Sequence, residues 1–454
     1  KDKDRKDKFE MKKRLLGTLM TIAMLTTSLM GCSTGNTTSE NSQAHGTENM
    51  KGKTEVDFWY SGGKTAVKVV QDIVDDYNKS QDKYFVKTVT QADYSETYEK
   101  LQAAIAGNVA PDVALIEKDA ARGLSDKKLV EDLSDRIKKD ENFNNDDYVS
   151  TFFEQAKDDK GKIYGIPAYG TTQVLYYNKK AFENAGIDPN SIKTWQDLSR
   201  AASKIKDDGQ FIYGWEPMWG ADNLMDAALS NGGTIFSEDG KKVTINSEEW
   251  IEAWDGFGKW IHDDKTMAIH SGGQGWEYWY QTIDDVIQNK AGGYTGSSGD
   301  QADLDFSIVG AIEQPAWKNG TESKPVARAL ILSILAKSSE EKQAGAYDFM
   351  KYFTNVENQV KWSMSTGYVP VNKGVLNDDD YMKYTNENPQ ALVPYTQAEH
   401  GSIYPYDPTN GVVKDALKIA ADKVEIDGVP AKEALDEAQK TAQKALDEVL
   451  TDKK

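Results

Sequence analysis

The chain carries many groups able to do acid–base or metal chemistry, but they follow no catalytic pattern. There is no nucleophile elbow, no phosphate-binding loop of the Walker type and no HExxH motif. The 454 residues include one cysteine, Cys32, and four histidines, His45, His262, His270 and His400. A cysteine-based metal site is excluded, and a histidine-rich zinc site is not expected. We predict a protein without catalytic residues, bound metal or cofactor.

Tryptophan is the side chain best suited to stacking on a ligand, and eight of the eleven tryptophans lie between Trp195 and Trp279. Trp215 and Trp219 stand in a segment with Pro217 and two glycines, which predicts a loop. For these two side chains, ligand stacking and simple packing are both open. A further set at helical spacing predicts one buried helix face: Trp250, Trp254, Phe257 and Trp260.

Arginine is scarce, since only four follow residue 31, and Arg328 lies inside the apolar, strand-like run 326–335. An arginine is seldom buried without an anionic partner. One interpretation is that Arg328 clamps a ligand carboxylate with two hydrogen bonds. The other is that it faces solvent or pairs with a carboxylate of the chain itself.

The most specific pattern surrounds Cys32. Lys12, Lys13 and Arg14 precede an apolar stretch over 15–30, which is shorter than the roughly 20 residues of a membrane-spanning helix. The stretch ends in Leu-Met-Gly-Cys32, which resembles a lipobox, cleaved before a cysteine whose thiol receives a diacylglycerol. We predict a signal peptide at 1–31, with an N-terminal extension at 1–10, and a lipid anchor on Cys32. The alternative is a plain signal peptide with a chance cysteine.

Composition divides the rest of the chain into a tether and a folded body. Residues 32–53 are rich in Ser, Thr, Asn, Gly and Glu, a composition that buries no core and predicts a flexible tether. The following 400 or so residues suggest two domains. Without residues 1–31 the chain carries 46 basic and 69 acidic groups. This acidic balance argues against nucleic-acid binding, which needs a positive surface.

The folded body begins with a strand–helix pattern. Residues 55–60 alternate like a strand, 67–77 have helical spacing, and 84–89 form a second β-like run. A helix then ends near Gly107, and 113–116 is an apolar run of the kind found in buried parallel strands. This order predicts an α/β architecture, in which ligands lie beyond the carboxyl ends of the strands. The rule places Tyr60 and Glu117 at a candidate site. A C-terminal helix is expected from about 430 to 450.

From about Lys53 to the C-terminus the chain resembles the extracellular solute-binding proteins of bacterial ABC importers, in the group that binds sugars and, in one branch, glycerol 3-phosphate. The order and spacing of several short motifs carry the resemblance. They are Phe58-Trp-Tyr60, Gly107-Asn-Val-Ala-Pro-Asp112 leading to Glu117, Val174-Leu-Tyr-Tyr-Asn178, Ala185-Gly-Ile-Asp-Pro189, Thr194-Trp-Gln-Asp-Leu198 and Ser365-Thr-Gly-Tyr-Val-Pro-Val371.

The resemblance implies a two-lobed periplasmic-binding-protein fold of type II, with each lobe a mostly parallel sheet flanked by helices and joined to the other by hinge strands. Closure of the lobes over a ligand is the motion such proteins use. We expect the N-terminal lobe at 54–168 plus 299–336 and the C-terminal lobe at 169–298 plus 337–454.

The resemblance also implies ligand-binding residues. Tyr94 matches the tyrosine before the second helix, Glu117 the acid after the third strand, and Thr171 a small hydroxyl residue after the Ile-Pro segment. Two cleft tryptophans, a serine turn and the Thr-Gly-Tyr-Val-Pro motif supply the others: Trp215, Trp219, Ser298 and Tyr368. Tyr60 and Arg328 join this set from their positions alone.

Two departures from the glycerol-phosphate branch bear on the ligand. Arg328-Ala329 stands where that branch has two glycines, and its phosphate-binding arginine has no counterpart in the C-terminal segment with Tyr404, Tyr406 and Lys414. We expect a mono- or oligosaccharide, an acidic one if Arg328 faces the ligand. Glycerol 3-phosphate or a glycerophosphodiester remains the alternative within the same fold.

Other protein classes share some of these features. A secreted glycan-active enzyme would also be anchored, acidic and rich in tryptophan, but it would turn its ligand over. A surface adhesin, or a receptor serving a chemosensor, is a further alternative, although adhesins favour repeats and β-rich modules. The expected partners of a monomeric binding protein are a sugar, the transmembrane subunits of an ABC permease and, through Cys32, the extracellular face of the cell membrane.

Overall fold

A computed structural model describes residues 52–274 and 276–452, which belong to one compact unit. The predicted signal peptide, the lipidation site Cys32 and the tether up to residue 51 lie outside the described residues. Among the residues that are described, no helix combines the length and the apolar character needed to cross a bilayer.

The strands and helices follow one another in the alternating manner expected from the sequence. The strands are β1 (Thr54–Tyr60), β2 (Tyr84–Thr90), β3 (Val113–Glu117), β4 (Ile166–Asn178), β5 (Glu216–Pro217), β6 (Gly293–Ser297), β7 (Val309–Ile312) and β8 (Ala327–Ile334). The α-helices are α2 (Lys64–Ser80), α3 (Tyr94–Ala106), α4 (Lys118–Asp126), α5 (Ser134–Lys139), α6 (Ser150–Phe153), α7 (Lys179–Asn184), α8 (Trp195–Asp207), α9 (Ala221–Ser230), α10 (Glu248–Gly258), α11 (Glu277–Ile287), α12 (Glu340–Phe353), α13 (Val356–Thr366), α14 (Asp379–Glu387), α15 (Val393–His400), α16 (Val412–Glu425) and α17 (Ala431–Asp452). Shorter helical turns are η1 (Asn145–Asp147), η2 (Glu154–Ala156), η3 (Pro189–Ser191), the π-helical η4 (Lys259–Asp263), η5 (Ser298–Asp303), η6 (Lys373–Asn377) and η7 (Pro389–Leu392).

Local sequence explains most of these elements. In β1, Val56, Phe58 and Tyr60 alternate with less buried residues, so one face of the strand is apolar. Thr194 and Asp197 form a reciprocal capping box at the start of α8. Gly367 ends α13 in the left-handed conformation, φ 76°, that glycine adopts without strain. The predicted strands and helices of the first 117 residues, and the C-terminal helix, are thus confirmed where the structure describes them.

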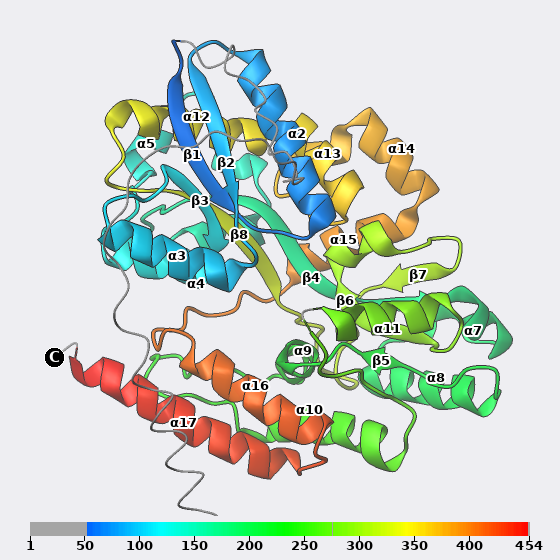
Figure 1. The fold of residues 1–454 in the computed structure, drawn as a ribbon. Helices are drawn as coiled ribbons and strands as arrows, with labels where there is room; N and C mark the ends of the chain where they lie inside the picture. The colour runs from blue at the N-terminus through cyan, green and yellow to red at the C-terminus, as the bar shows by residue number, and fades with distance from the viewer. Residues whose placement is uncertain (1–51, 275, 453–454) are drawn as a thin grey trace, which may run out of the picture. The chain divides into compact units, whose positions relative to one another are not determined.

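The sheet is mixed, and β4 is its longest strand. The strand order is β2-β1-β3-β8-β4-β6-β5, and β7 also pairs with β4. β1 is parallel to β2 and β3, whereas β8 runs antiparallel to both β3 and β4. The first half of β4 pairs with β8 and its second half with β6 and β7, so one strand passes through both parts of the sheet (Figure 1).

Buried apolar side chains form two main cores at the two ends of β4. The first core gathers β1, β2, β3, β8, α12 and α13, and reaches Tyr169 of β4. The second core starts at Leu175 of β4 and gathers α8, α9, α10, α16 and α17, with a smaller cluster around Tyr176 on the other face of the strand. The chain crosses between the cores in β4, at Val326–Ala327, and between Ala398 and Tyr404.

The cores differ from the predicted lobe boundaries in two segments. Residues 337–371, together with Tyr395 and Ala398, were expected in the C-terminal lobe but lie in the first core, because α12 and α13 return to pack on β1 and α2. Val309 and Trp317, expected in the N-terminal lobe, lie with the second core, because β7 pairs with the second half of β4. An apolar helix face predicts burial, but it does not say which side of a hinge it packs on.

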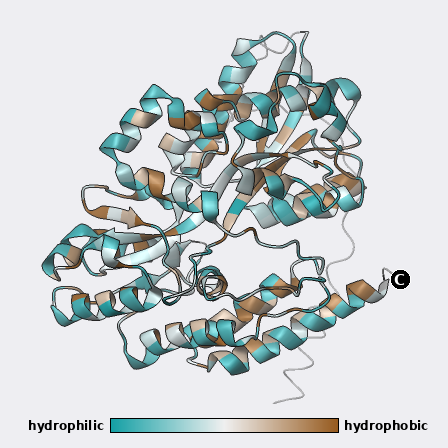
Figure 2. Ribbon diagram, turned by 180° about the vertical axis from the view of Figure 1, so that it is seen from behind, coloured by the Kyte–Doolittle hydropathy of each residue, from teal (hydrophilic) through white to brown (hydrophobic). Residues whose placement is uncertain are grey.

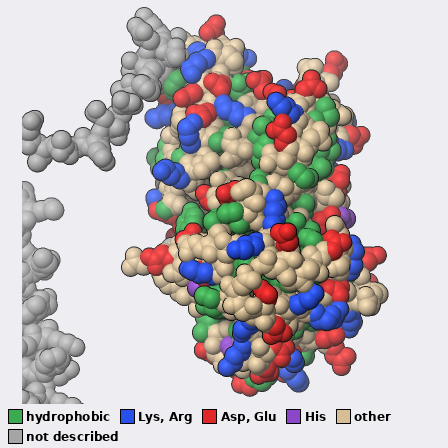
Figure 3. All heavy atoms as spheres, turned by 90° about the vertical axis from the view of Figure 1, so that its right-hand side faces the viewer, with side chains coloured by type: hydrophobic (Ala, Val, Ile, Leu, Met, Phe, Trp, Pro, Cys, Tyr) green, Lys and Arg blue, Asp and Glu red, His purple; other side chains and the backbone are tan. Residues whose placement is uncertain are grey.

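The surface is charged and mixed in sign. Around the outer helices hydrophobic and hydrophilic residues alternate, as expected for helices with one face packed inward (Figure 2). On the face drawn in Figure 3, acidic and basic side chains are intermingled, and basic groups do not gather into a continuous area. This face lacks the basic footprint that nucleic-acid binding requires.

Candidate functional site

The candidate site begins where the sheet passes from one core to the other. Thr171 of β4 lies opposite Arg328 of β8 in the antiparallel register. The Oγ atoms of Thr171 and Ser297 are 3.1 Å apart, and the Ser298 hydroxyl donates to Thr171 Oγ1 at 3.3 Å. Ser298 is fully buried, whereas Thr171 and Ser297 are partly exposed. Ser298 therefore positions Thr171, and Thr171 and Ser297 present hydroxyls at the crossing point.

A group of tyrosines from the first core lies beside these hydroxyls. The Tyr94 and Tyr169 hydroxyls are 2.7 Å apart, and the Tyr368 ring centroid is 4.9 Å from that of Tyr169. Burial raises the pKa of all three phenols above the ordinary value, so they are neutral at physiological pH. Tyr94 and Tyr368 stay partly exposed. Such rings offer both an apolar face and a hydroxyl to a ligand.

Gly299 allows Tyr368 to reach this position. A Cβ atom built on Gly299 would lie 2.6 Å from the Tyr368 ring, which is closer than side chains tolerate. The serine turn of 297–299 is thus tied to the tyrosine of the Thr-Gly-Tyr-Val-Pro motif by direct packing. This contact explains why two motifs that are distant in sequence belong to one site.

Glu117 ends β3 and faces the second core across the junction. Its carboxylate Oε1 is 3.6 Å from Lys414 Nζ of α16, and both side chains are 47% exposed. The pair is weak in water. Glu117 retains free acceptor positions for ligand hydroxyls, because Lys414 approaches only one of its oxygens among the described contacts.

Arg328 is held by an internal partner. Its NH1 and NH2 groups donate to the two carboxylate oxygens of Asp222, at 2.8 and 2.5 Å, in a bidentate pair that joins β8 to the first turn of α9. Burial opposes ionisation of Asp222, but the neighbouring guanidinium prevails and holds its pKa well below the ordinary range. The interpretation that Arg328 pairs with a carboxylate of the chain is the one the structure supports.

The charges around Arg328 are mostly negative. Asp222, Asp226 and Glu117 all act on the guanidinium. Burial raises the pKa of Asp226 to about 7, so this acid is partly protonated near neutral pH. The positive charges close to these acids include Arg328 and Lys414, which lies near Glu117 and Asp222. An added anion would meet no unpaired guanidinium here, which disfavours a carboxylate or phosphate ligand.

Trp219 lies in the turn before α9, three residues before the Asp222 that pairs with Arg328. It is partly exposed, donates from Nε1 to Asp422 at 2.8 Å, and packs edge to face with Tyr278 at 4.9 Å between ring centroids. Burial raises the pKa of Tyr278, and the nearby carboxylate of Asp222 raises it further. Trp219 and Tyr278 therefore continue the site toward α11.

Two predicted ligand-binding residues do not join this group. Trp215 is fully buried in the second core, where its Nε1 donates to Thr295 Oγ1 at 3.0 Å. Tyr60 is 1% exposed in the first core, where its ring stacks on Phe58 at 5.1 Å. Both predictions are wrong for the same reason. Each residue lies in a short segment whose sequence allows the side chain to point either way, and in the structure it points into the core.

Sequence reasoning missed four residues of the site: Tyr169, Asp222, Tyr278 and Ser297, which immediately precedes the predicted Ser298. Tyr169 lies two residues before Thr171 on β4, so the period of two along a strand could have placed both on one side. Asp222 is the acid in the first turn of α9, a position favoured by the helix dipole. Nothing local to Tyr278 distinguishes it from the neighbouring aromatics of α11.

Within residues 52–274 and 276–452, one group of three side chains could hold a metal ion. It comprises Glu216 of β5, His270 from the loop before α11, and Asp285 of α11. The group lies in the second core, and none of its members was among the predicted site residues.

Comparison with known proteins gives one family. The sequence model described as "bacterial extracellular solute-binding protein" matches residues 72–390. A curated relative, the sn-glycerol-3-phosphate-binding periplasmic protein UgpB of Yersinia pseudotuberculosis, is 25% identical over 378 residues, or 79% of this chain and 83% of its own.

Solved structures of similar fold are described with different solutes. UgpB from Mycobacterium tuberculosis, in complex with glycerophosphocholine, has a TM-score of 0.75 at 21% identity and covers 88% of this chain and 100% of its own. The cyclic alpha-maltosyl-1,6-maltose binding protein from Arthrobacter globiformis has a TM-score of 0.72 at 20% identity, with 87% and 100% covered. The GacH receptor of Streptomyces glaucescens, solved with acarbose, scores 0.74 at 18% identity over 87% and 99%. The type II fold is thereby confirmed.

Proposed function

Because the chain belongs to the bacterial extracellular solute-binding proteins, we propose that it captures an uncharged mono- or oligosaccharide between its two lobes and delivers it to an ABC permease. Members of this family bind solutes for transport and do not transform them. The ligand-binding group comprises Tyr94, Glu117, Thr171, Trp219, Ser297 and Tyr368, with Asp222 and Arg328 as a paired neighbour.

One observation carries the proposal: neutral aromatic hydroxyls and the half-exposed carboxylate of Glu117 lie near the point where the paired strands β4 and β8 pass from one core to the other. Tyr94 and Tyr368 pack against the first core, and Trp219 precedes α9, which packs in the second. A sugar presents apolar C–H faces, which stack on aromatic rings, and hydroxyls, which donate to carboxylates. The stacking and the hydrogen bonds can therefore both form with a ligand that carries no net charge.

The pairing of Arg328 with Asp222 favours an uncharged sugar over the acidic one first considered. A uronate or a phosphate would have to displace Asp222 from the guanidinium and leave a carboxylate unpaired. Leaving one partner of such a pair unpaired typically costs about 3–5 kcal/mol. Because relatives bind glycerol 3-phosphate and glycerophosphocholine, the test below also includes phosphorylated ligands.

A thermal-shift panel tests the proposal. It contains mono-, di- and oligosaccharides, uronic acids, glycerol 3-phosphate and glycerophosphocholine. A neutral sugar at about 100 times its Kd should stabilise the chain by about 2.7 kcal/mol, with no product formed. If only the phosphorylated compounds stabilise the chain, the ligand is a glycerophosphate and the sugar proposal is wrong. If the sugar is converted to a product, the protein is an enzyme.

Site variants locate the binding. Tyr94→Phe and Glu117→Gln each remove one polar contact and should weaken a sugar about tenfold, since a hydrogen bond to a charged group is worth about 1.5–3 kcal/mol. Tyr98→Phe on the same helix and Glu55→Gln in the exposed pair with Lys87 are matched controls and should bind normally. Unchanged affinity in both site variants would move the binding site elsewhere.

We also propose that the chain works as a lipid-anchored monomer on the extracellular face of the membrane. The support is the Leu-Met-Gly-Cys32 pattern after a short apolar stretch. Mass spectrometry of the N-terminal peptide from the bacterial membrane fraction should find a diacylglyceryl group on Cys32. Cys32→Ser should release the protein into the medium, and its retention at the membrane would contradict the anchor.

A further inference from the structure

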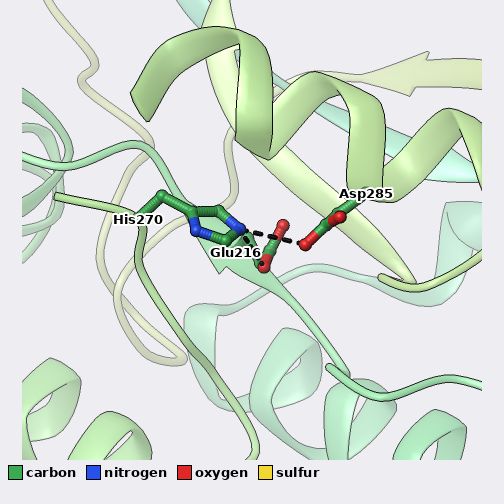
Figure 4. A group of neighbouring side chains, drawn as sticks. All are labelled: Glu216, His270 and Asp285. Carbon is green, nitrogen blue, oxygen red and sulfur yellow. Dashed lines mark hydrogen bonds and ion pairs between the residues drawn. The ribbon is translucent and has the colours of Figure 1, made fainter. Parts of the chain in front are cut away.

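We propose that Glu216, His270 and Asp285 form a binding site for a divalent transition-metal ion, with Zn²⁺ the preferred ion, beside the edge strand β5. The three residues come from different segments: a two-residue strand, the loop before α11, and α11 itself. Figure 4 shows their polar ends converging on one point.

The distances suit a small ion. His270 Nε2 lies 3.4 Å from Glu216 Oε1 and 2.9 Å from Asp285 Oδ2, and all three donor atoms lie within 4.8 Å of one another. Zinc binds histidine nitrogen at about 2.0–2.1 Å and carboxylate oxygen at about 2.0–2.2 Å, which in tetrahedral geometry separates neighbouring donors by about 3.4 Å. Both His270 distances lie within about 0.5 Å of this spacing.

Glu216 supplies an independent reason to expect a ligand. It is fully buried, and neither of its carboxylate oxygens has a hydrogen-bond partner among the described residues. Buried carboxylates are almost always hydrogen-bonded, paired or bound to metal. A cation between the two acids removes the cost of burying this unpaired group.

The donor set selects among metals. One imidazole nitrogen with two carboxylates suits Zn²⁺ and its first-row neighbours, whereas Ca²⁺ seeks six to eight oxygen ligands and Mg²⁺ retains several waters. Lys290 Nζ lies 3.0 Å from Asp285 Oδ1 and leaves Oδ2 facing His270. His270 is partly exposed, so water can complete the coordination.

The site would hold α11 against the edge of the sheet. β5 is the last strand in the sheet order and is only two residues long, so it has few hydrogen bonds of its own. A metal bridging Glu216 and Asp285 joins this strand to α11. The same helix carries Tyr278 and Trp279, and Tyr278 contacts Trp219. Metal binding would therefore fix one wall of the proposed sugar site.

Metal binding is measured on the full chain in detergent, without an affinity tag and stripped with chelator. We expect one Zn²⁺ per chain after dialysis, by elemental analysis, and competition with a zinc-binding dye. At about 100 times the Kd, Zn²⁺ should raise Tm by on the order of 5 °C, and Ca²⁺ should not. No bound zinc, or an equal shift with Ca²⁺, would overturn the proposal.

Two variants and one control separate the site from adventitious binding. Glu216→Gln keeps the side-chain shape without a charge to bury, so its metal-free Tm should equal or exceed that of the parent while the zinc-induced rise disappears. His270→Ala should also abolish the rise. His400→Ala is the control: in the described part of the chain, His400 forms an ion pair with Glu313 away from the proposed site. This variant should keep the zinc-induced rise in Tm. A zinc response retained in Glu216→Gln would refute the site, whatever sugar binding shows.

Discussion

Two tryptophans four residues apart, Trp215 and Trp219, have different surroundings. The first is sealed in the second core and donates to Thr295, whereas the second is partly exposed and packs against Tyr278. The two-residue strand β5 ends at Pro217, so Trp219 lies in the turn before α9 and its side chain does not follow the direction of the strand. The same residue type therefore stabilises the fold at one position and is available to a ligand at the other.

Substitution should separate these two roles. Trp215→Ala should lower the free energy of unfolding by about 3–5 kcal/mol, because it leaves a large cavity. Trp219→Ala should cost less stability but weaken the sugar about tenfold, as expected for loss of one aromatic contact. Urea unfolding and calorimetric titration measure the two effects. If Trp219→Ala loses as much stability as Trp215→Ala and binds the sugar with unchanged affinity, Trp219 has a structural role only.

Asp300 gives a pH dependence at the same scale. It is buried beside the serine turn, where Trp279 Nε1 and the Tyr294 hydroxyl donate to its two oxygens at 2.9 and 3.2 Å. Burial raises its pKa to about 8. The folded chain thus keeps a proton that the unfolded chain releases near pH 4. Stability from this group is fully present below about pH 4 and is lost as pH rises to about 8.

Urea unfolding at several pH values between about 5 and 8 should show this loss, at up to about 1.4 kcal/mol per pH unit. Asp300→Asn should flatten the profile by removing that contribution. Asp146→Asn, at an exposed position in η1 and absent from the charges that act on Asp300, is the control and should keep the parent's slope. Parallel profiles for parent and Asp300→Asn would show that Asp300 is ionised when folded.

At the scale of elements, β4 is the feature on which the site depends. Its first half belongs to the first core and its second half to the second, and Thr171 lies at the change. Gly170 makes the crossing possible, because a Cβ atom there would lie 2.0 Å from Phe152 Cζ. Gly170 also exchanges two backbone hydrogen bonds with Val369, next to Tyr368. The tyrosine group is positioned by this close approach.

Gly170→Ala should therefore destabilise the chain by about 1–3 kcal/mol, since the buried Phe152 ring has no room to give way. Gly123→Ala is a matched control inside α4, where the nearest atom to a new Cβ is Tyr98 Oη at 3.7 Å. That change should be neutral or stabilise by about 0.5–1 kcal/mol. Denaturant unfolding compares them, and a Gly170→Ala protein as stable as the control would contradict the close packing.

At the scale of the whole described body, two cores share three crossing segments and a few side-chain contacts. Those contacts include the Glu117–Lys414 pair, the Arg328–Asp222 pair and the stacking of Arg122 on Tyr406 at 4.9 Å. All are polar or partly exposed, so they constrain the lobes far less than the apolar cores constrain each lobe. Such a construction favours hinge closure around a ligand.

Small-angle scattering should detect that closure. A saturating neutral sugar should reduce the radius of gyration, with a titration midpoint equal to the calorimetric Kd, because the ligand contacts both lobes only when they approach. A sugar that gives no thermal shift serves as the control. Tight binding without any change in scattering would mean that the lobes are already closed around the site.

The sequence alone determined most of the elements and the two-lobed fold. Short motifs in a fixed order suggested Tyr94, Glu117, Thr171 and Tyr368 as ligand contacts, and these stay predictions. Alternation and short apolar runs predicted β1, β2, β3 and β8, and the same motifs predicted the two-lobed fold. These predictions succeed because burial periodicity and motif order are local properties. The lobe boundaries were harder, because an apolar stripe on α12 or α13 is the same whichever core it packs on.

Only the tertiary structure decided what each polar side chain meets. Arg328 finds its partner in Asp222, 106 residues away, and this pairing removes the reason to favour an acidic sugar among the mono- and oligosaccharides expected. Tyr60 and Trp215 turn into the cores, although their segments could equally have presented them outward. Glu216 meets His270 and Asp285 only because an edge strand, a loop and a helix converge. Contacts of this kind depend on how the chain crosses between the lobes, and no local spacing encodes that path.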